Sequence, residues 1–191
     1  SIIPAVATNG AISLGRHRLP QLITTQQIAE VVSRIAAEVT RDYRGKRPLL
    51  IGILKGSFVF LADIIRCLDM AVEVEFITLS SYESGTHTSG RVTIIRGARM
   101  PLRGRDIIVV EDIVDTGMTL NFLLTQLKRR RPASLRVCTL LDKASRRQVD
   151  VPIDYRGFVV PDRFIVGYGL DCDQQFRHLP GLYVLQEGCE E

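Results

Sequence analysis

The chain has 191 residues, 46% of them hydrophobic, and a formal net charge of +4 at pH 7. A chain of this length and apolar content can build one domain with a buried core. No apolar stretch approaches the roughly 18 residues that a membrane-spanning helix needs, and the N-terminal residues lack the basic flank and the apolar length of a secretory signal. We therefore expect a soluble cytoplasmic protein with no membrane partner.

Helical and strand patterns alternate along the chain. Thr24 and Gln27 form a capping-box pattern, after which apolar residues recur at helical spacing to about Tyr43. Short apolar runs bounded by polar turns predict strands, several of them followed by amphipathic helices. The expected helices cover residues 24–43, 58–68 and 119–131, and the expected strands cover residues 48–54, 71–80, 92–95, 107–110, 135–141, 155–160, 164–168 and 183–185. This order predicts an α/β fold with a central, mostly parallel twisted sheet flanked by helices.

Residues 81–91 (SYESGTHTSGR) are polar and glycine-bearing, and they separate two of the expected strands. We expect those strands, 71–80 and 92–95, to pair as a long hairpin. Because the segment between them has almost no apolar side chain to anchor it, we expect a mobile loop. The alternative is a solvent-exposed hairpin tip without a function.

Residues 107–120 read IIVVEDIVDTGMTL and carry the strongest functional signal. The β-branched run at 107–110 predicts a buried parallel strand, so that Glu111, Asp112 and Asp115 follow where the strand ends. Ligands of open α/β sheets bind at that edge, and a Gly/Thr turn that opens a helix offers N–H groups and hydroxyls to a phosphate. The pattern suggests a sugar phosphate with a metal. The alternative is an ordinary strand, turn and capped helix with solvated acids.

This segment resembles the phosphoribosyl diphosphate (PRPP) binding signature of the type I phosphoribosyltransferases. The resemblance implies that the acidic pair meets the ribose hydroxyls and that the following turn wraps the 5-phosphate. Carboxylates accept hydrogen bonds from hydroxyls, whereas hydroxyl and amide groups donate to phosphate. The implied ribose and 5-phosphate residues are Glu111, Asp112, Asp115, Thr116, Gly117, Met118 and Thr119. Asp115 is the candidate general base.

Lys55 and Gly56 follow the expected strand 48–54 and begin a second strand-to-helix junction. The spacing of a P-loop is absent, so a nucleotide triphosphatase is not expected. The segment resembles the diphosphate loop of purine phosphoribosyltransferases, which often contains a non-proline cis peptide at the bond that is here Leu54–Lys55. The resemblance implies that Lys55 and Gly56 bind diphosphate.

Lys143, in LLDKAS, follows the expected strand 135–141 and so ends at the same sheet edge as the acidic residues. The resemblance places Lys143 against the exocyclic oxygen of a purine. An ammonium group can only donate hydrogen bonds, so it favours a 6-oxo group over a 6-amino group. The alternative is a solvated lysine.

Residues 161–177 (PDRFIVGYGLDCDQQFR) resemble the C-terminal hood motif of the hypoxanthine-guanine phosphoribosyltransferases. The resemblance implies that Phe164 stacks on the base, although its pattern alone predicts a core residue, and that Ile165 offers backbone groups to the pairing edge of the base. It also implies that Asp171 binds Mg²⁺, together with Glu111 and Asp112, and that Arg177 contacts diphosphate. Two positions depart from the common pattern, Arg163 and Cys172, which leaves details of the base contacts and of hood packing open.

The same resemblance makes residues 81–91 a lid that begins at Ser81 and Tyr82 and closes over the site. It implies a single phosphoribosyltransferase domain over residues 21–191, with a core of about 45–150. A small hood lobe combines the C-terminal segment, about 154–186, with the N-terminal region. Residues 1–20 match nothing in the family, and we expect an N-terminal extension that need not be ordered.

Four cysteines are widely spaced and form no CxxC pair; they are Cys67, Cys138, Cys172 and Cys189. This spacing disfavours a zinc site and a disulfide framework, and favours small buried side chains. The basic run at residues 128–132 (KRRRP) permits nucleic-acid contact, but it lies at the end of an expected helix, where cations complement the helix dipole.

The expected function is purine salvage: Mg²⁺-dependent transfer of ribose 5-phosphate from PRPP to hypoxanthine or guanine, with release of diphosphate. The resemblance implies a homodimer or homotetramer. One alternative is a PRPP-sensing regulator that binds nucleic acid on the same fold, although a sensor does not need the base-binding and catalytic residues. Within enzymes, a pyrimidine or adenine transferase is disfavoured by the hood motif.

Overall fold

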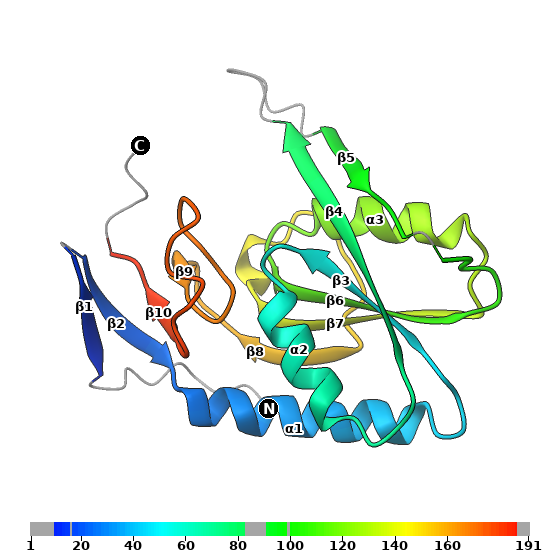
Figure 1. The fold of residues 1–191 in the computed structure, drawn as a ribbon. Helices are drawn as coiled ribbons and strands as arrows, with labels where there is room; N and C mark the ends of the chain where they lie inside the picture. Colours follow the sequence, from blue (N-terminus) through cyan, green and yellow to red (C-terminus); the bar gives the residue numbers. More distant parts are fainter. Residues whose placement is uncertain (1–9, 16, 83–90, 99, 187–191) are drawn as a thin grey trace.

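The computed structural model describes residues 10–15, 17–82, 91–98 and 100–186 (Figure 1). A six-stranded sheet in the order β5-β4-β3-β6-β7-β8 forms the main body of this part of the chain. Its strands are β3 (Leu49–Leu54), β4 (Glu73–Tyr82), β5 (Arg91–Arg96), β6 (Asp106–Val114), β7 (Ser134–Asp142) and β8 (Tyr155–Val159). All neighbouring strands are parallel except β5, which pairs with β4 as an antiparallel hairpin. The predicted mostly parallel sheet and the predicted hairpin are confirmed.

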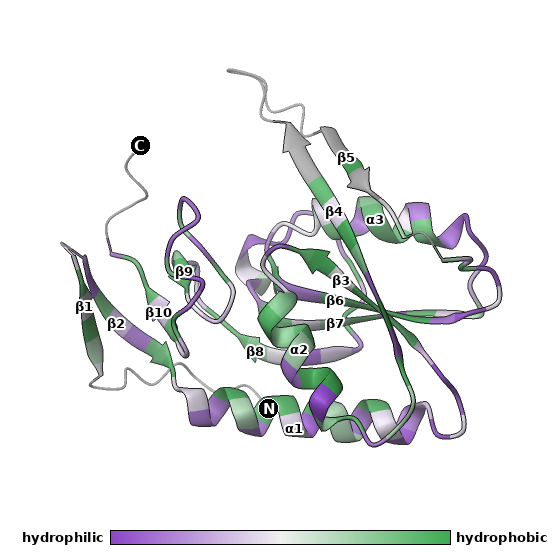
Figure 2. Ribbon diagram, viewed as in Figure 1, coloured by the Kyte–Doolittle hydropathy of each residue, from purple (hydrophilic) through white to green (hydrophobic). Residues whose placement is uncertain are grey.

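Three α-helices cover the two faces of this sheet: α1 (Thr25–Asp42), α2 (Phe58–Cys67) and α3 (Met118–Lys128). The predicted capping box starts α1, since the Thr24 hydroxyl accepts from the amide of Gln27 and the Gln27 side chain accepts from the amide of Thr24. Figure 2 shows hydrophobic and hydrophilic bands alternating along α1, as expected for a helix with one buried face.

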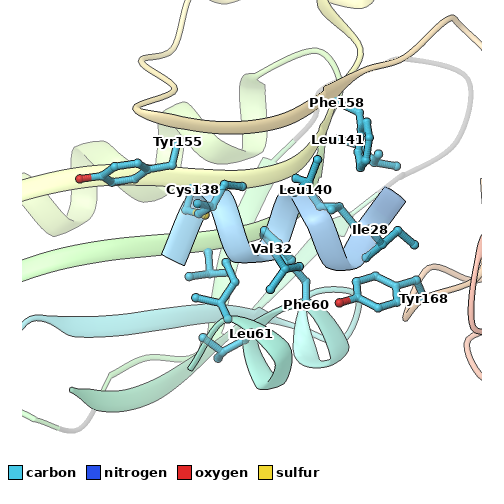
Figure 3. Close-up of a cluster of buried hydrophobic side chains, with 14 of the residues drawn as sticks. Ile28, Val32, Phe60, Leu61, Cys138, Leu140, Leu141, Tyr155, Phe158 and Tyr168 are labelled. Carbon is cyan, nitrogen blue, oxygen red and sulfur yellow. The ribbon is translucent and has the colours of Figure 1, made fainter. Parts of the chain in front are cut away.

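The helices and the sheet enclose two cores. Residues of α1 and α2 pack on one face of the sheet, whereas residues of α3 pack on the other. Figure 3 shows part of the first core, with labelled side chains from α1 (Ile28, Val32), α2 (Phe60, Leu61), β7 (Cys138, Leu140, Leu141), β8 (Tyr155, Phe158) and the C-terminal region (Tyr168). Because alternate residues of a strand face opposite sides, Leu50 of β3 enters the first core and Leu49 and Ile51 enter the second.

A second, four-stranded sheet in the order β1-β2-β10-β9 lies beside the main sheet (Figure 1). Its strands are β1 (Ala11–Leu14), β2 (His17–Ile23), β9 (Ile165–Val166) and β10 (Leu182–Val184). We call this sheet and its connecting segments, residues 10–23 and 164–185 as far as they are described, the hood. The hood has its own small core, with Leu19 and Val166 at its centre. The predicted hood lobe from both ends of the chain is therefore present.

The N-terminal strands differ from the expectation for residues 1–20. We expected an extension that need not be ordered, but the described residues from 11 onward form the hairpin β1-β2, and β2 pairs with β10. The sequence pattern missed β2, whose partner β10 lies near the other end of the chain, and with it β1, which pairs with β2. In addition, β8 belongs to the main sheet, so the C-terminal contribution to the hood begins later than residue 154.

Three expected elements have different bounds. Strand β6 runs to Val114 instead of Val110, because β7 continues to pair with it after β3 has stopped. Helix α3 ends at Lys128 and not near Arg131, whose φ of 53° is left-handed. The expected strand 164–168 is reduced to β9, because Gly167 and Tyr168 turn the chain with positive φ values.

The cysteines also differ in part from the expectation. Cys67 and Cys138 are free thiols, and Cys138 is buried as expected. Cys172, in the hood core, is disulfide-bonded. The expectation of small buried thiols is therefore wrong for Cys172, which is not a free thiol, and for Cys67, which is exposed.

The strand order reverses between β3 and β6, and such a reversal opens a crevice at the carboxyl edge of a sheet. From β3 the chain passes through α2 to β4 on one side, and from β6 it passes through α3 to β7 on the other. Pairing between β3 and β6 ends at Gly52 and Val110, while β6 continues beside β7 to the pair of Val114 with Asp142. Such a reversal of strand order is where open α/β sheets bind ligands.

Candidate active site

The two predicted phosphate-binding junctions meet at this crevice. Lys55 and Gly56 follow β3, and the Leu54–Lys55 peptide bond is cis, as the resemblance implied. A Cβ atom placed on Gly56 would lie 1.8 Å from Oδ2 of Asp112. The fully buried Ser57 fixes the junction from below, since its hydroxyl donates to the carbonyl of Ile53 at 2.7 Å. Only glycine therefore lets the loop backbone approach the acidic pair this closely.

Glu111 and Asp112 form an acidic pair near the end of β6. Burial, followed by the negative charge of Asp112, raises the pKa of Glu111 well above its usual range. Burial also raises the pKa of Asp112, although a hydrogen bond with Glu111 and backbone amides oppose the change. In the described part of the chain, neither carboxylate forms an ion pair with a basic side chain. The pair is thus available to hydroxyl groups or to a cation that a ligand brings.

The turn after β6 has the construction of a phosphate cradle. Gly117 has a φ of 84° and precedes the first turn of α3, where backbone N–H groups lack partners within the helix. A Cβ on Gly117 would lie 2.4 Å from the carbonyl oxygen of Val149. The carbonyl of Thr116 accepts from the amides of Gln148 and Val149 at 2.9 and 3.0 Å. The segment after β7 therefore supports the turn from outside, while Thr116, Gly117, Met118 and Thr119 remain together at the start of α3.

Asp115 lies in a small network of charges at the same edge. Its Oδ1 is 3.1 Å from Nε of Arg146, and its Oδ2 is 4.0 Å from Nζ of Lys143. Asp162 contacts the same two cations, at 3.4 Å from Arg146 and 4.0 Å from Lys143. The sequence analysis predicted Asp115 and Lys143 as site residues, and the structure brings them together. Arg146 was not predicted, although it lies only three residues after Lys143.

An ion cluster around the buried Asp142 supports the backbone that leads into the phosphate cradle. Nε of Arg147 donates to the carbonyl of Asp115 at 3.1 Å, and its guanidinium group pairs with Asp142. The Asp142 side chain is 2% exposed and also accepts from Arg156 at 2.9 Å. A buried carboxylate between two guanidinium groups fixes the position of Arg147. Asp142 and Arg147 were not predicted as site residues, because their role depends on contacts between segments that are separate in sequence.

Phe164 and Ile165 lie in the hood, at the start of β9. Phe164 is 46% exposed, so the core assignment that its pattern alone favoured is wrong, and an exposed aromatic face is free to stack on a ligand. The carbonyl of Phe164 accepts from the amide of Leu185 at 2.9 Å, which ties the residue to the end of β10. Ile165 is buried in β9 and paired with Val184.

The hood also brings Asp171 and Arg177 to the Lys55 loop. Nη2 of Arg177 is 2.9 Å from Oδ1 of Asp171, and Nη1 donates to the carbonyl of Gly169 at 2.8 Å. A Cβ on Gly169 would lie 2.4 Å from the carbonyl oxygen of Gly56, so the two turns touch. The turn that carries Asp171 and Arg177 therefore lies against the loop of Lys55 and Gly56.

Two predicted features are not assembled in the described residues. The lid tip, residues 83–90, lies outside them, and for Ser81 and Tyr82 the structure describes the backbone of β4 and not the side chains. Within the described ranges, no three His, Cys, Asp or Glu side chains lie close enough to hold a metal ion by themselves. Magnesium in sites for phosphorylated substrates commonly takes one or two carboxylates and completes its shell with substrate and water oxygens. The acidic pair Glu111 and Asp112 offers two carboxylates of the type that such a site uses, and Asp171 offers one.

The chain matches the family model for the phosphoribosyl transferase domain over residues 20–173. It is 42% identical over 166 residues to the hypoxanthine-guanine phosphoribosyltransferase of Streptococcus pneumoniae R6, which covers 87% of this chain and 92% of the relative. The hypoxanthine phosphoribosyltransferase of Escherichia coli K12 is 42% identical over 167 residues, 86% of this chain and 94% of the relative. A crystal structure of a hypoxanthine-guanine phosphoribosyltransferase from Bacillus anthracis has a TM-score of 0.83 at 44% identity, covering 86% of this chain and 97% of that chain. The chain therefore belongs to the phosphoribosyl transferase family.

Proposed function

We propose that the protein is a purine salvage enzyme that transfers ribose 5-phosphate from PRPP to hypoxanthine or guanine and releases diphosphate. The products are the corresponding nucleotides, IMP and GMP. The observation that carries this proposal is the meeting of three groups at one sheet edge. An acidic pair near the end of β6, a phosphate cradle at the start of α3 and Lys143 after β7 follow two neighbouring parallel strands, and Lys143 contacts Asp115 between them.

The site suits the separation of charge in this reaction. As the bond between the anomeric carbon and diphosphate breaks, positive charge grows on the sugar ring and negative charge grows on the leaving group. The buried carboxylates of Glu111 and Asp112 favour the first charge, whereas Lys55 and Arg177 favour the second. When bound by Asp171 and the acidic pair, Mg²⁺ would neutralise part of the diphosphate charge.

Asp115 is suited to the role of general base. Bond formation at one imidazole-ring nitrogen of the purine makes the other nitrogen acidic, and the Asp115 carboxylate accepts that proton. Arg146 lies beside one oxygen of the Asp115 carboxylate and Lys143 lies beside the other, so the two cations limit rotation of the carboxylate. A positioned base typically contributes about 10²- to 10⁴-fold, so positioning and electrostatics supply most of the acceleration.

The purine is held by groups from the sheet edge and from the hood. Lys143 donates to a 6-oxo group and would meet a donor in the 6-amino group of adenine, which disfavours that base. Phe164 stacks on the ring, and backbone groups of Ile165 meet its pairing edge. Residues 81–91 close as a lid and keep water from the activated sugar. Deleting residues 85–89 should raise hydrolysis of PRPP relative to transfer.

The decisive experiment measures nucleotide formation from PRPP and each of hypoxanthine, guanine and xanthine with Mg²⁺. We expect product with hypoxanthine or guanine, and we expect adenine and orotate to be poor substrates. Parallel titration with DNA and RNA tests the regulator alternative. The basic residues after α3 lie at the C-terminal end of that helix, where they complement its dipole. Nucleic-acid binding without nucleotide formation would refute the proposed activity.

Assembly and location remain predictions. We propose a homodimer or homotetramer, which sedimentation equilibrium of the full chain would establish. None of the described helices is long and apolar enough to cross a membrane. The cytoplasmic location expected from the sequence can be tested by fractionation of cells that produce the protein.

A further inference from the structure

We propose that Gln174 is a built-in competitor of diphosphate: its side-chain carbonyl occupies the cations that would bind the leaving group, and the substrate must displace it. This inference rests on the proposed function, since it assumes that Lys55 and Arg177 bind diphosphate. It adds a residue that the sequence analysis did not single out. The contact joins a turn of the hood to the Lys55 loop.

The contacts converge on one oxygen atom. Nζ of Lys55 donates to Oε1 of Gln174 at 2.9 Å, and Nη2 of Arg177 donates to the same atom at 3.3 Å. These two cations come from positions 122 residues apart in the chain, one after β3 and one in the hood. A single neutral oxygen between a lysine and an arginine has the arrangement that an oxygen of a diphosphate would take.

The backbone of Gln174 engages the predicted metal ligand as well. Its amide donates to Oδ2 of Asp171 at 2.8 Å, while Oδ1 of Asp171 is paired with Arg177 at 2.9 Å. Each oxygen of this carboxylate therefore accepts from one protein donor. Because a carboxylate oxygen has a further lone pair, Mg²⁺ with diphosphate would share Asp171 with these donors or replace one of them.

Two residues of the turn that carries Gln174 have backbone conformations that residues with a Cβ atom rarely adopt. Asp173 and Gln174 have φ values of 46° and 61°, in the left-handed region that disfavours residues with a Cβ. Cys172 and Gln175 close the turn through a pair of backbone hydrogen bonds. Strained conformations persist where surrounding contacts hold them. The contacts of Gln174 to Lys55, Arg177 and Asp171 are such contacts, and exchanging them for ligand contacts gives the turn another arrangement.

The competition has a defined direction. A neutral amide oxygen is a weaker acceptor for ammonium and guanidinium groups than a charged phosphate oxygen. PRPP and diphosphate therefore displace Gln174, but their apparent affinity is reduced by the strength of the contact that they replace. After transfer, the returning side chain favours release of diphosphate.

The test is calorimetric titration of the full-length protein with inorganic diphosphate in Mg²⁺ buffer. Removing the competing oxygen in Gln174→Ala should tighten diphosphate binding about three-fold, as expected for an exposed hydrogen-bonded contact. Gln174→Glu places a carboxylate between the same cations and should weaken binding by at least as much. Gln175→Ala is the matched control, because Gln175 is an exposed glutamine in the same turn whose side chain does not contact Lys55 or Arg177.

Hydrogen exchange of residues 171–177 supplies a second measurement that does not depend on activity. Exchange without ligand should be faster in Gln174→Ala than in the unmodified protein, and the two should agree once diphosphate is bound. Equal or weaker diphosphate binding by Gln174→Ala would overturn the inference while leaving the proposed function intact. If the unmodified protein neither binds diphosphate nor forms nucleotide from PRPP, the proposed function itself fails.

Discussion

The sheet edge and the hood each supply half of the site, and they hold their residues by different means. At the sheet edge, Glu111 and Asp112 are part of a strand, and the following turn is fixed by backbone hydrogen bonds from residues after β7. In the hood, Asp171 and Arg177 are held by side-chain contacts within an irregular turn. Backbone register tolerates little displacement, whereas side-chain contacts can be exchanged. We therefore expect changes at the sheet edge to affect turnover, and changes in the hood to affect affinity.

The largest effect should come from Asp115→Asn at the sheet edge. Loss of the general base should lower kcat about 10²- to 10⁴-fold while KM for PRPP changes little. Steady-state kinetics with hypoxanthine measure both values. Asp162→Asn is the control, since Asp162 shares Lys143 and Arg146 with Asp115 and is not the proposed base. A kcat unchanged in the Asp115 variant would assign proton transfer to another group.

Gly56→Ala tests how closely the two junctions must approach. A Cβ at Gly56 would clash with the Asp112 carboxylate, so the Lys55 loop or β6 must shift. A displacement of about 1 Å near reacting groups can cost about 10²-fold, and we expect a loss of that size in kcat/KM for PRPP. Gly97→Ala is the control, because a Cβ there would make an ordinary contact of 3.7 Å with Ile94. Equal kinetics of the two variants would show that the close approach is not required.

Phe164→Ala tests the hood half. Because stacking of a base on an aromatic ring contributes about 1–3 kcal/mol, KM for the purine should rise about ten-fold while kcat changes far less. Phe58→Ala removes a similarly exposed phenylalanine on α2 and should leave the purine KM unchanged. A loss confined to kcat in the Phe164 variant would contradict the division between turnover and affinity.

Glu111→Gln should have the smallest effect, and it concerns stability. The folded protein holds the Glu111 proton to higher pH than the unfolded chain does, because its pKa is raised well above the usual range. The stability from this group is therefore present below the ordinary glutamate pKa and is lost as pH rises through the raised value. Without ligand, the variant should be more stable at pH 7 by about 1 kcal/mol, a common size for single substitutions.

Urea denaturation between pH 4 and pH 8 measures this difference, which should vanish near pH 4. Glu30→Gln, on the exposed face of α1, is the control. A stability difference for Glu111→Gln that does not depend on pH would contradict the proposed cause.

Much of the fold was predictable because the patterns that encode it are local. The capping box of α1 and the apolar runs of the parallel strands each lie within a few residues of one another, and the structure confirms them. The short strands at the N-terminus were not recognised, since a two-stranded hairpin is marginally stable by itself and β1-β2 is completed only when β10 pairs with β2.

The candidate site divides in the same way. Its phosphate cradle and acidic pair were expected from one contiguous segment, because the groups that bind one phosphate lie on one turn of backbone. The cis peptide was implied by the family resemblance of a second segment. Arg146, Asp142, Arg147 and Gln174 were not expected. They act through partners on other strands or in the other lobe, so no local pattern records them.

The sequence by itself determined which strands would be buried, which turns would carry glycine and acid, and the family whose signature those turns resemble. The tertiary structure decided how far β6 extends beside β7, and it decided that the two ends of the chain share one sheet. It also decided that a glutamine of the hood meets the lysine after β3. The physical reason is that backbone conformation and burial are fixed by neighbouring residues, whereas ion pairs and strand partners depend on which distant surfaces the fold brings together.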